Sequence, residues 1–217
     1  MGFAVVLAGG DVPERRLVAG TETATLVVAA DGGVRIARSL GLPIHAVVGD
    51  LDSASEGDLA WARAEGADVI EFPTDKAHTD LELAFQHAEG APDIDRIVVL
   101  GVEGGRLDHE FGNWAVCCGK WGVGVDVVTD RGIVHVLRGD GCNTVALEGT
   151  AGDVVSILPR LGSAVGVTTE GLRWELDDAV LYAEQSRGVS NEFLAEAATI
   201  SIRSGALLVV RPGATGW

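Results

Sequence analysis

Short apolar runs alternate with segments of helical spacing through the first two thirds of the chain. The apolar runs predict strands at 4–7, 25–30, 46–48, 69–72, 96–100 and 125–128. Helical spacing predicts helices between them at 34–40, 55–65, 79–88 and 109–120. Short, uniformly apolar strands separated by helices are typical of parallel strands that are buried on both faces. We therefore expect an α/β domain with a mostly parallel sheet over residues 1–140.

The pattern changes after about residue 140. Strand-like segments now follow one another across Gly-rich turns, at 143–147, 154–158, 165–169, 199–202 and 206–210. Only 177–182 hints at a different element. We predict a second domain, an all-β sandwich over residues 141–217. The segment 133–137 fits either domain.

Carboxylates follow the predicted parallel strands where these strands end. Asp50 and Asp52 come directly after the strand 46–48, in the motif GDLDS. Open parallel sheets bind ligands at the carboxyl ends of their strands, so this edge is the expected functional rim. The other acidic residues expected near it are Asp31, Asp75, Asp80 and Asp108.

This acidic rim favours metal–phosphate chemistry. Mg²⁺ prefers oxygen ligands and usually binds through a few carboxylates together with substrate phosphates. The predicted metal ligands are Asp50, Asp52, Asp75, Asp80 and Asp108. The alternative is that these residues only cap helices. Capping suits Asp31 or Asp80 taken alone better than it suits GDLDS and GGRLDH together.

Basic residues and glycines lie among the carboxylates. Lys76, His78, Arg106 and His109 can neutralise phosphate oxygens. Gly9-Gly10 and Gly104-Gly105 either make ordinary turns or let the backbone approach a phosphate closely. Neither GxxxxGK[ST] nor GxGxxG occurs in the sequence, so it contains no P-loop and no dinucleotide fingerprint.

Composition narrows the partners further. The formal net charge of −16 argues against nucleic acid or an anionic membrane as a partner. Cys117, Cys118 and Cys142 form no CxxC pair, which makes a zinc site unlikely and fits thiols in a reducing compartment. No apolar run reaches the length of a membrane span, and the N-terminus lacks the basic start of a signal peptide. We expect a cytoplasmic protein.

Several motifs together resemble the thiamine pyrophosphokinase family. In the first domain they are ADGGVRIARSLGLPIHAVVGDLDS, FPTDKAHTDLELAF and LGVEGGRLDHEFGN. In the β module they are GDVVSILP, TTEGLRWELDD and GVSNEF. The resemblance covers nearly the whole chain, and the combination is specific although each motif alone is weak. It implies Mg²⁺-dependent transfer of a pyrophosphoryl group from ATP to the hydroxyl of thiamine, giving thiamine diphosphate and AMP. It also implies a homodimer.

The resemblance also implies roles for single residues. The implied catalytic residues are Asp50, Asp52, Asp80, Asp108 and Arg106. The implied nucleotide contacts are Gly9, Gly10, Asp31, Gly32, Lys76, His78, Thr79, Gly105 and His109. Trp174 is similar to an aromatic residue that stacks on thiamine. Ser190 and Asn191 are similar to a polar pair in the thiamine pocket. The alternatives are that Trp174 is a core tryptophan and that Ser190 and Asn191 form an ordinary turn.

One position departs from the family pattern. The family often has an acidic residue directly after the lysine of DKAHTD, where this chain has Ala77. Two other functions therefore stay open beside thiamine pyrophosphokinase. One is a pyrophosphokinase for another heterocyclic alcohol such as a pterin, which would not be expected to carry GLRW and SNE. The other is a thiamine- or nucleotide-binding protein with weakened catalysis.

Overall fold

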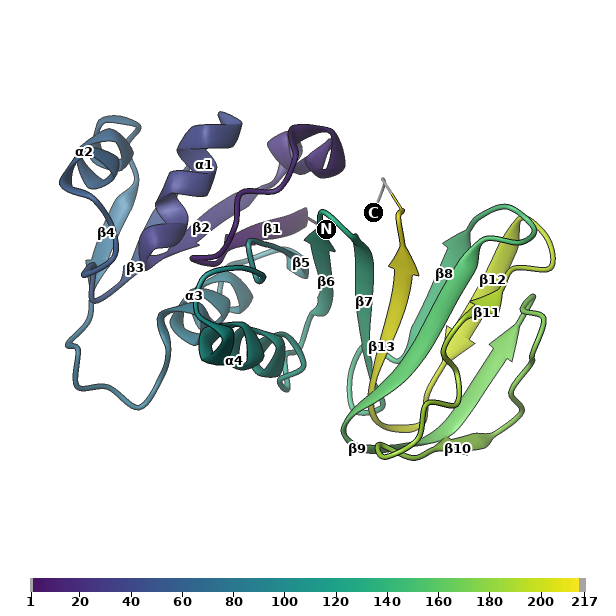
Figure 1. The fold of residues 1–217 in the computed structure, drawn as a ribbon. Coiled ribbons are helices and arrows are strands. Elements are labelled where there is room, and N and C mark those ends of the chain that lie inside the picture. The colour runs from purple at the N-terminus through teal and green to yellow at the C-terminus, as the bar shows by residue number, and fades with distance from the viewer. Residues whose placement is uncertain (1, 215–217) are drawn as a thin grey trace. The chain divides into compact units, whose positions relative to one another are not determined.

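The computed structural model describes residues 2–214, which divide into two compact units. The first unit holds residues 2–117 and 127–130, and the second holds residues 118–126 and 131–214. Strand β6 (Gly124–Thr129) contributes residues to both units. Figure 1 shows helices only in the first unit and strands in both. The division into folding domains at residue 140 stays a prediction.

The first unit is built on a parallel sheet with the order β4-β3-β2-β1-β5. Its strands are β1 (Gly2–Leu7), β2 (Leu26–Ala30), β3 (Ala46–Gly49), β4 (Asp68–Glu71) and β5 (Ile94–Leu100). In the central register, Val5 pairs with Val27 on one side and Val98 on the other. All three side chains are fully buried, which explains the uniformly apolar runs. The predicted parallel sheet is confirmed.

Helices cover both faces of this sheet. They are α1 (Val34–Leu40), α2 (Glu56–Ala64), α3 (Asp80–Glu89) and α4 (Leu107–Cys117), with the 3-10 turns η1 (Arg15–Val18), η2 (Thr21–Thr23) and η3 (Asp31–Gly33). Figure 1 shows α1 and α2 on one face and α3 and α4 on the other. Helix α4 begins two residues earlier than predicted, because Gly104 and Gly105 hold left-handed conformations just before it. Asp108 therefore lies in its first turn.

The strand order places a switch point between β1 and β5. The chain moves from β1 outward through β2, β3 and β4, and then returns to pair β5 with the opposite side of β1. Ligands in open α/β sheets bind at the carboxyl ends of strands beside such a point. The loops after β1, β2, β3 and β5 all leave this same edge.

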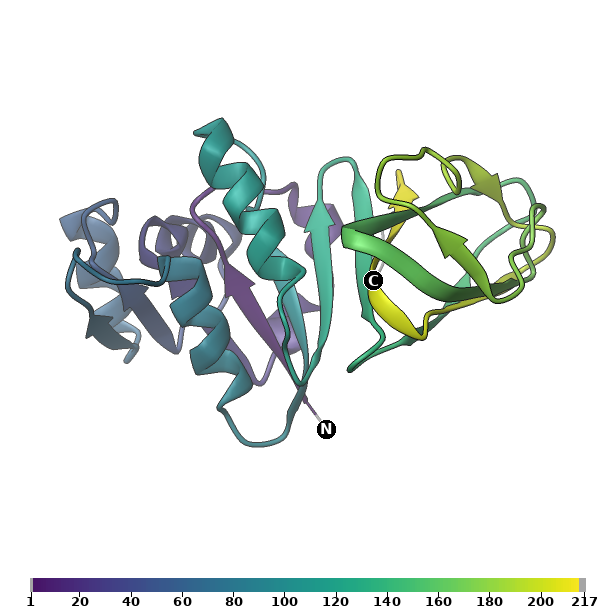
Figure 2. The same ribbon diagram turned by 90° about the horizontal axis from the view of Figure 1, so that it is seen from below.

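The second unit is antiparallel. Its strands are β7 (Gly132–Arg138), β8 (Thr144–Glu148), β9 (Val154–Glu170), β10 (Ala179–Leu181), β11 (Asn191–Glu192), β12 (Ala197–Ser201) and β13 (Ser204–Pro212). One apolar core, which includes Leu137, Ile157, Leu172, Ile200 and Leu207, lies inside these strands. Strand β7 pairs with β13 over its whole length, so the segment 133–137 belongs to the second unit. Figure 2 shows the strands curving around this core.

Strand β9 corrects one prediction from the sequence. The segments 154–158 and 165–169 are predicted as separate strands, but they form one strand of 17 residues. Its first half pairs with β13, and its last residues pair with β12. Leu161 (φ 57°) and Gly162 (φ 119°) bend the strand between these partners. A β-bulge within one strand and a turn between two strands both need residues with positive φ. The sequence pattern alone therefore does not distinguish one bent strand from two strands. The segment 177–182 likewise contains a strand, β10.

None of the helices described in residues 2–214 has the length and apolar composition needed to cross a bilayer.

Candidate active site and ligand pocket

Three carboxylates converge at the carboxyl ends of β2 and β3. Asp31 directly follows β2, and Asp50 and Asp52 follow β3. One oxygen of each carboxylate lies within 4.8 Å of the others. Asp31 is buried, Asp50 is half-buried and Asp52 is exposed, so the group opens toward solvent on one side. Such an oxygen-only set suits a hard divalent cation.

Backbone strain accompanies this group. Leu51, between the two aspartates of GDLDS, has φ 63°, and Asp31 has φ 43°. Left-handed conformations cost energy for residues with a Cβ, and they concentrate at functional sites. The Asp31 carboxylate stabilises the turn by accepting hydrogen bonds from Ser53 N (3.1 Å) and Ala54 N (3.0 Å). Burial raises the pKa of Asp31, against the opposing effect of the hydrogen bonds from Ser53.

A fourth carboxylate, that of Asp80, lies beside the group but outside it, and glycine at residue 49 leaves room for it. A Cβ on Gly49 would lie 3.0 Å from Asp31 Cβ and 3.0 Å from the Asp80 carboxyl carbon. Asp80 is the first residue of α3, whose N-cap is Thr79 with its hydroxyl accepting from Glu82 N. The N-terminus of a helix favours negative charge, which helps to hold the Asp80 carboxylate there.

Lys76 joins the carboxylates. Its ammonium donates a hydrogen bond to Asp50 Oδ2 at 3.1 Å and lies 3.1 Å from Asp80 Oδ1. The second contact is an ion pair between residues four apart in the chain, so positive charge also faces the buried Asp80 Oδ1. Burial of Asp50 opposes its ionisation, but the hydrogen bond and charge of Lys76 outweigh this and lower its pKa. Burial likewise opposes the charge of Lys76, and its carboxylate partners raise its pKa.

Three of the predicted acidic ligands, Asp75, Asp80 and Asp108, lie outside this 4.8 Å group within residues 2–214. Asp75 is exposed in the loop before α3. Asp108 is exposed at the start of α4, where Arg106 donates two hydrogen bonds to it, at 3.1 and 2.6 Å. The hydrogen bonds and charge of Arg106 hold the Asp108 pKa at about 2. Arg106 and Asp108 therefore form a solvent-exposed ion pair on the loop after β5.

The predicted glycine loops lie at the switch point. Gly10 N donates to Gly101 O, and Asp11 N donates to Glu103 O, which ties the loop after β1 to the loop after β5. A Cβ on Gly10 would overlap Glu103 O and Gly101 O, so this close approach requires glycine. Gly9 and Gly105, in contrast, have open space around the Cβ position within the described residues.

The other predicted nucleotide contacts lie on the same unit. Gly32 lies in the turn η3, against Ser53. His78 Nδ1 lies 3.0 Å from Glu82 Oε1, and His109 is exposed in the first turn of α4. Sequence reasoning missed Arg35, whose guanidinium donates to the carbonyl oxygens of Gly9 and Gly10. The cue in the sequence is DGGVR, which puts Arg35 in the first turn of a helix at this edge.

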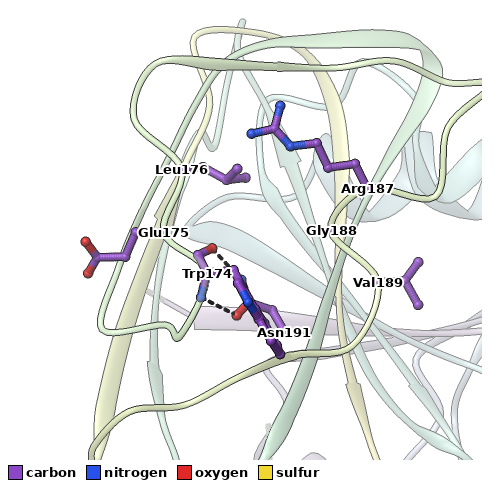
Figure 3. A pocket seen from close by; sticks show the side chains of 7 residues that line it. All are labelled: Trp174, Glu175, Leu176, Arg187, Gly188, Val189 and Asn191. Atoms are coloured by element: carbon purple, nitrogen blue, oxygen red, sulfur yellow. Dashed lines mark hydrogen bonds between the residues drawn. The ribbon is translucent and has the colours of Figure 1, made fainter.

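The second unit contains a hollow of about 410 Å³. Its lining residues are Trp174, Glu175, Leu176, Arg187, Gly188, Val189 and Asn191. Trp174 is 54% exposed, so it is a surface residue rather than a core tryptophan. Figure 3 shows Asn191 beside Trp174, joined to it by two hydrogen bonds. Ser190 is exposed and does not line the hollow.

Comparison with known proteins finds a matching family model in each of the two units. The family model for the thiamin pyrophosphokinase catalytic domain matches residues 19–129, and the model for the thiamin pyrophosphokinase vitamin B1 binding domain matches residues 143–207. Thiamine pyrophosphokinase from Bacillus subtilis is 25% identical over 95% of this chain and 96% of that protein. Thiamine pyrophosphokinase 1 from rice is 26% identical over 75% of this chain, and the match spans 63% of the rice protein.

Solved structures show the same fold. A crystal structure of thiamine pyrophosphokinase from Bacillus subtilis matches with a TM-score of 0.80 and 22% identity, over 97% of this chain and 98% of that one. Thiamin pyrophosphokinase from Candida albicans matches with a TM-score of 0.76 and 14% identity, over 97% of this chain and 89% of that one. The predicted combination of an α/β domain and a β-sandwich domain is confirmed.

Proposed function

The chain belongs to the thiamin pyrophosphokinase family, and on this premise we propose that it transfers a pyrophosphoryl group from ATP to the hydroxyl of thiamine. The products are thiamine diphosphate and AMP. The observation that carries the proposal is the convergence of Asp31, Asp50 and Asp52 in the unit that the catalytic-domain model matches. The hollow beside Trp174, in the unit that the vitamin B1 binding model matches, supports thiamine as the acceptor.

The carboxylate group fits a magnesium ion. Asp50 and Asp52 would hold it, with Asp31 and Asp80 beside them, and all of their donors are oxygens. Such an ion, when bound, would supply positive charge that neutralises phosphate oxygens. The Lys76 ammonium lies 3.1 Å from both Asp50 Oδ2 and Asp80 Oδ1, which is consistent with a place that attracts cations. Asp75, on the loop before α3, and Asp108, in the first turn of α4, lie outside this group and are the weaker candidates as ligands.

The chain's own residues would do three further things for ATP. Lys76 supplies positive charge at the carboxylate group, and Arg106 supplies it on the exposed loop after β5. Gly9 and Gly105 leave open backbone beside the switch point, where phosphate oxygens can approach main-chain N–H groups. Phosphoryl-type transfer depends on positioning and charge neutralisation more than on covalent chemistry. Positive charge and open backbone N–H groups are therefore the kinds of feature that the proposed reaction needs.

The acceptor pocket suits a flat organic cation. Trp174 offers an exposed indole face, and a thiazolium ring is attracted to such a face through stacking and cation–π interaction. Leu176 and Val189 add apolar surface to the hollow. The match of residues 143–207 to a vitamin B1 binding domain favours thiamine over a pterin.

The test is direct. Purified protein is incubated with thiamine, ATP and Mg²⁺, and AMP and thiamine diphosphate are followed by chromatography. We expect both products in equal amounts, with loss of about 100-fold or more in Asp52→Asn because an anionic ligand of the proposed magnesium ion is removed. Glu65→Gln, an exposed carboxylate at the end of α2, is the control and should keep full activity. Binding of thiamine without product would instead support a binding protein with weakened catalysis.

Two further properties belong to the same proposal. We expect a cytoplasmic protein, and the family resemblance implies a homodimer. Light scattering on the purified full chain would give twice the monomer mass of 22.5 kDa for a dimer. A monomeric mass at enzyme-assay concentration would contradict the dimer without touching the proposed chemistry.

A further inference from the structure

We infer that Asn191 is a positioning residue that holds Trp174 in place, and not a ligand of thiamine. The inference rests on the proposed function of the hollow beside Trp174. It changes the role expected from the sequence, where Ser190 and Asn191 are a polar pair for the substrate. The reason lies in what the Asn191 side chain already contacts.

The side-chain amide of Asn191 forms hydrogen bonds with the protein's own backbone. Its Oδ1 accepts from Trp174 N at 3.1 Å and from Glu192 N at 2.9 Å. Its Nδ2 donates to Trp174 O at 2.8 Å. A carbonyl oxygen has two lone pairs, so both acceptor sites of Oδ1 are in use. Asn191 lines the hollow but is only 3% exposed, and just one hydrogen of its amide, the second on Nδ2, is not used in these bonds.

These hydrogen bonds replace a missing strand pairing. Leu172 makes an isolated bridge to Phe193, and Arg173 N donates to Glu192 O. At Trp174 the regular pairing stops, and the side-chain amide of Asn191 binds both the N–H and the carbonyl of this residue. An amide donor and acceptor thus satisfy the Trp174 peptide groups as a neighbouring strand would. Trp174 is thereby fixed at an otherwise irregular place on the surface.

The residue before Trp174 in the motif GLRW supports the indole ring itself. The Arg173 guanidinium lies 5.0 Å from the centroid of the Trp174 ring. Arg173 is held there by an ion pair with Glu192, with Nη1 2.8 Å from Oε2. Asn191 therefore fixes the backbone of Trp174, while Glu192 acts on one face of its ring through Arg173. The remaining surface of the indole is available to the hollow.

A double-mutant cycle tests this assignment. The variants are Asn191→Ala, Trp174→Ala and the double variant, and the KM for thiamine, the KM for ATP and kcat are measured for each. We expect Asn191→Ala to raise the thiamine KM roughly tenfold, because buried peptide groups lose their partner and the ring is misplaced. The KM for ATP and kcat should stay within about twofold. Gln185→Ala, which removes an exposed amide from a nearby loop, is the matched control and should change none of them.

The double variant gives the decisive result. If Asn191 acts through Trp174, its loss adds less than about twofold once the indole is gone, because interacting residues are not additive. If Asn191 binds thiamine itself, the two losses multiply, and this outcome would overturn the inference. An unchanged thiamine KM in Trp174→Ala would overturn the proposed pocket, and the inference with it. Those two failures are therefore distinguishable.

A spectroscopic measurement reads the same point without activity. The chain has five tryptophans, and Trp174→Phe identifies the Trp174 signal in ¹⁹F spectra of 5-fluorotryptophan-labelled protein. We expect Asn191→Ala to shift or broaden that signal and to leave the other four unchanged. An unmoved Trp174 signal would contradict the inference. If Asn191→Ala does not fold, Asn191→Asp replaces it in both experiments, since it has nearly the same shape and exchanges the donor to Trp174 O for a charged carboxylate oxygen.

Discussion

The ammonium of Lys76 lies 3.1 Å from Asp50 Oδ2, at the point where the protein is proposed to hold a divalent cation. Both side chains are mostly buried, with 13% and 11% of their surfaces exposed. The lysine thus neutralises part of the carboxylate charge in the free protein. A metal ion and this ammonium would compete for the same oxygen.

This relationship predicts the effect of Lys76→Met, which keeps the length of the side chain and removes its charge. We expect Mn²⁺, measured by calorimetry without nucleotide, to bind roughly tenfold more tightly, since a competing positive charge is gone. The KM for ATP should rise in the same variant. The control is Lys120→Met, at the chain's other lysine. Lys120 forms an ion pair with Asp140 in the second unit. Weaker or unchanged Mn²⁺ binding would show that Lys76 does not compete with the metal.

The absence of a side chain at Gly49 predicts how a larger residue there would affect stability and metal binding. In Gly49→Ala the new Cβ would lie 3.0 Å from Asp31 Cβ and from the Asp80 carboxyl carbon, so one carboxylate has to move. We expect a loss of about 1–3 kcal/mol in the free energy of unfolding, as for other overpacked sites, together with weaker Mn²⁺ binding. Urea unfolding and calorimetry measure the two effects.

The matched control is Gly57→Ala in α2, where a Cβ meets only side-chain atoms at 3.9 Å. This helix variant should be neutral or stabilising by up to about 1 kcal/mol, with metal binding unchanged. Equal behaviour of the two variants would contradict the spatial role of Gly49.

The cap of α2 predicts a dependence of stability on pH. Ser55 Oγ accepts from Asp58 N and donates to Asp58 Oδ2, and Arg38 donates to Asp58 Oδ1. The hydrogen bond from Ser55, followed by that from Arg38, lowers the pKa of Asp58 below its ordinary 3.8. A lowered folded-state pKa stabilises the protein above the unfolded-state pKa, and this contribution is lost as pH falls through the folded-state value.

Asp58→Asn should therefore lower the free energy of unfolding by about 1 kcal/mol at pH 7. The gap from the parent protein should narrow below pH 4 and be smallest near pH 3 or lower, as followed by urea unfolding across this range. Glu56→Gln, an exposed neighbour in the same first turn, should show little difference at any pH. A gap of constant size down to pH 3 would mean that the Asp58 charge does not contribute.

Ala77 predicts a gain of function. It is exposed in the loop between Lys76 and the start of α3, where its replacement costs no packing. Ala77→Asp adds a carboxylate next to the proposed metal group, so we expect Mn²⁺ affinity and kcat/KM to rise, by roughly threefold or more. Ala77→Asn controls for size without charge. A fall in both quantities for Ala77→Asp alone would show that the loop is adapted to the absence of this carboxylate.

The sequence predicts the strands and helices of the first unit because burial imposes a local pattern there. Strands such as β1 and β3 are covered on both faces, so every residue is apolar, and Gly41 ends α1 in the left-handed conformation expected of a C-cap. The acidic residues after β2 and β3 converge because parallel strands end at one edge. Asp31, Asp50 and Asp52 could therefore be proposed together from their places in the chain.

Tertiary structure decided what depends on contacts between distant segments. Whether PRLGSAVG turns or continues is set by the partners β13 and β12, so β9 is one bent strand. Lys76 reaches Asp50 only because the loop before α3 folds back over β3, and Asp108 turns instead to Arg106. Asn191 lies seventeen residues from Trp174, and no local sequence pattern predicts that its side-chain amide forms hydrogen bonds with the backbone of Trp174. The sequence thus determined which groups carry the chemistry, and packing in three dimensions determined which of them meet.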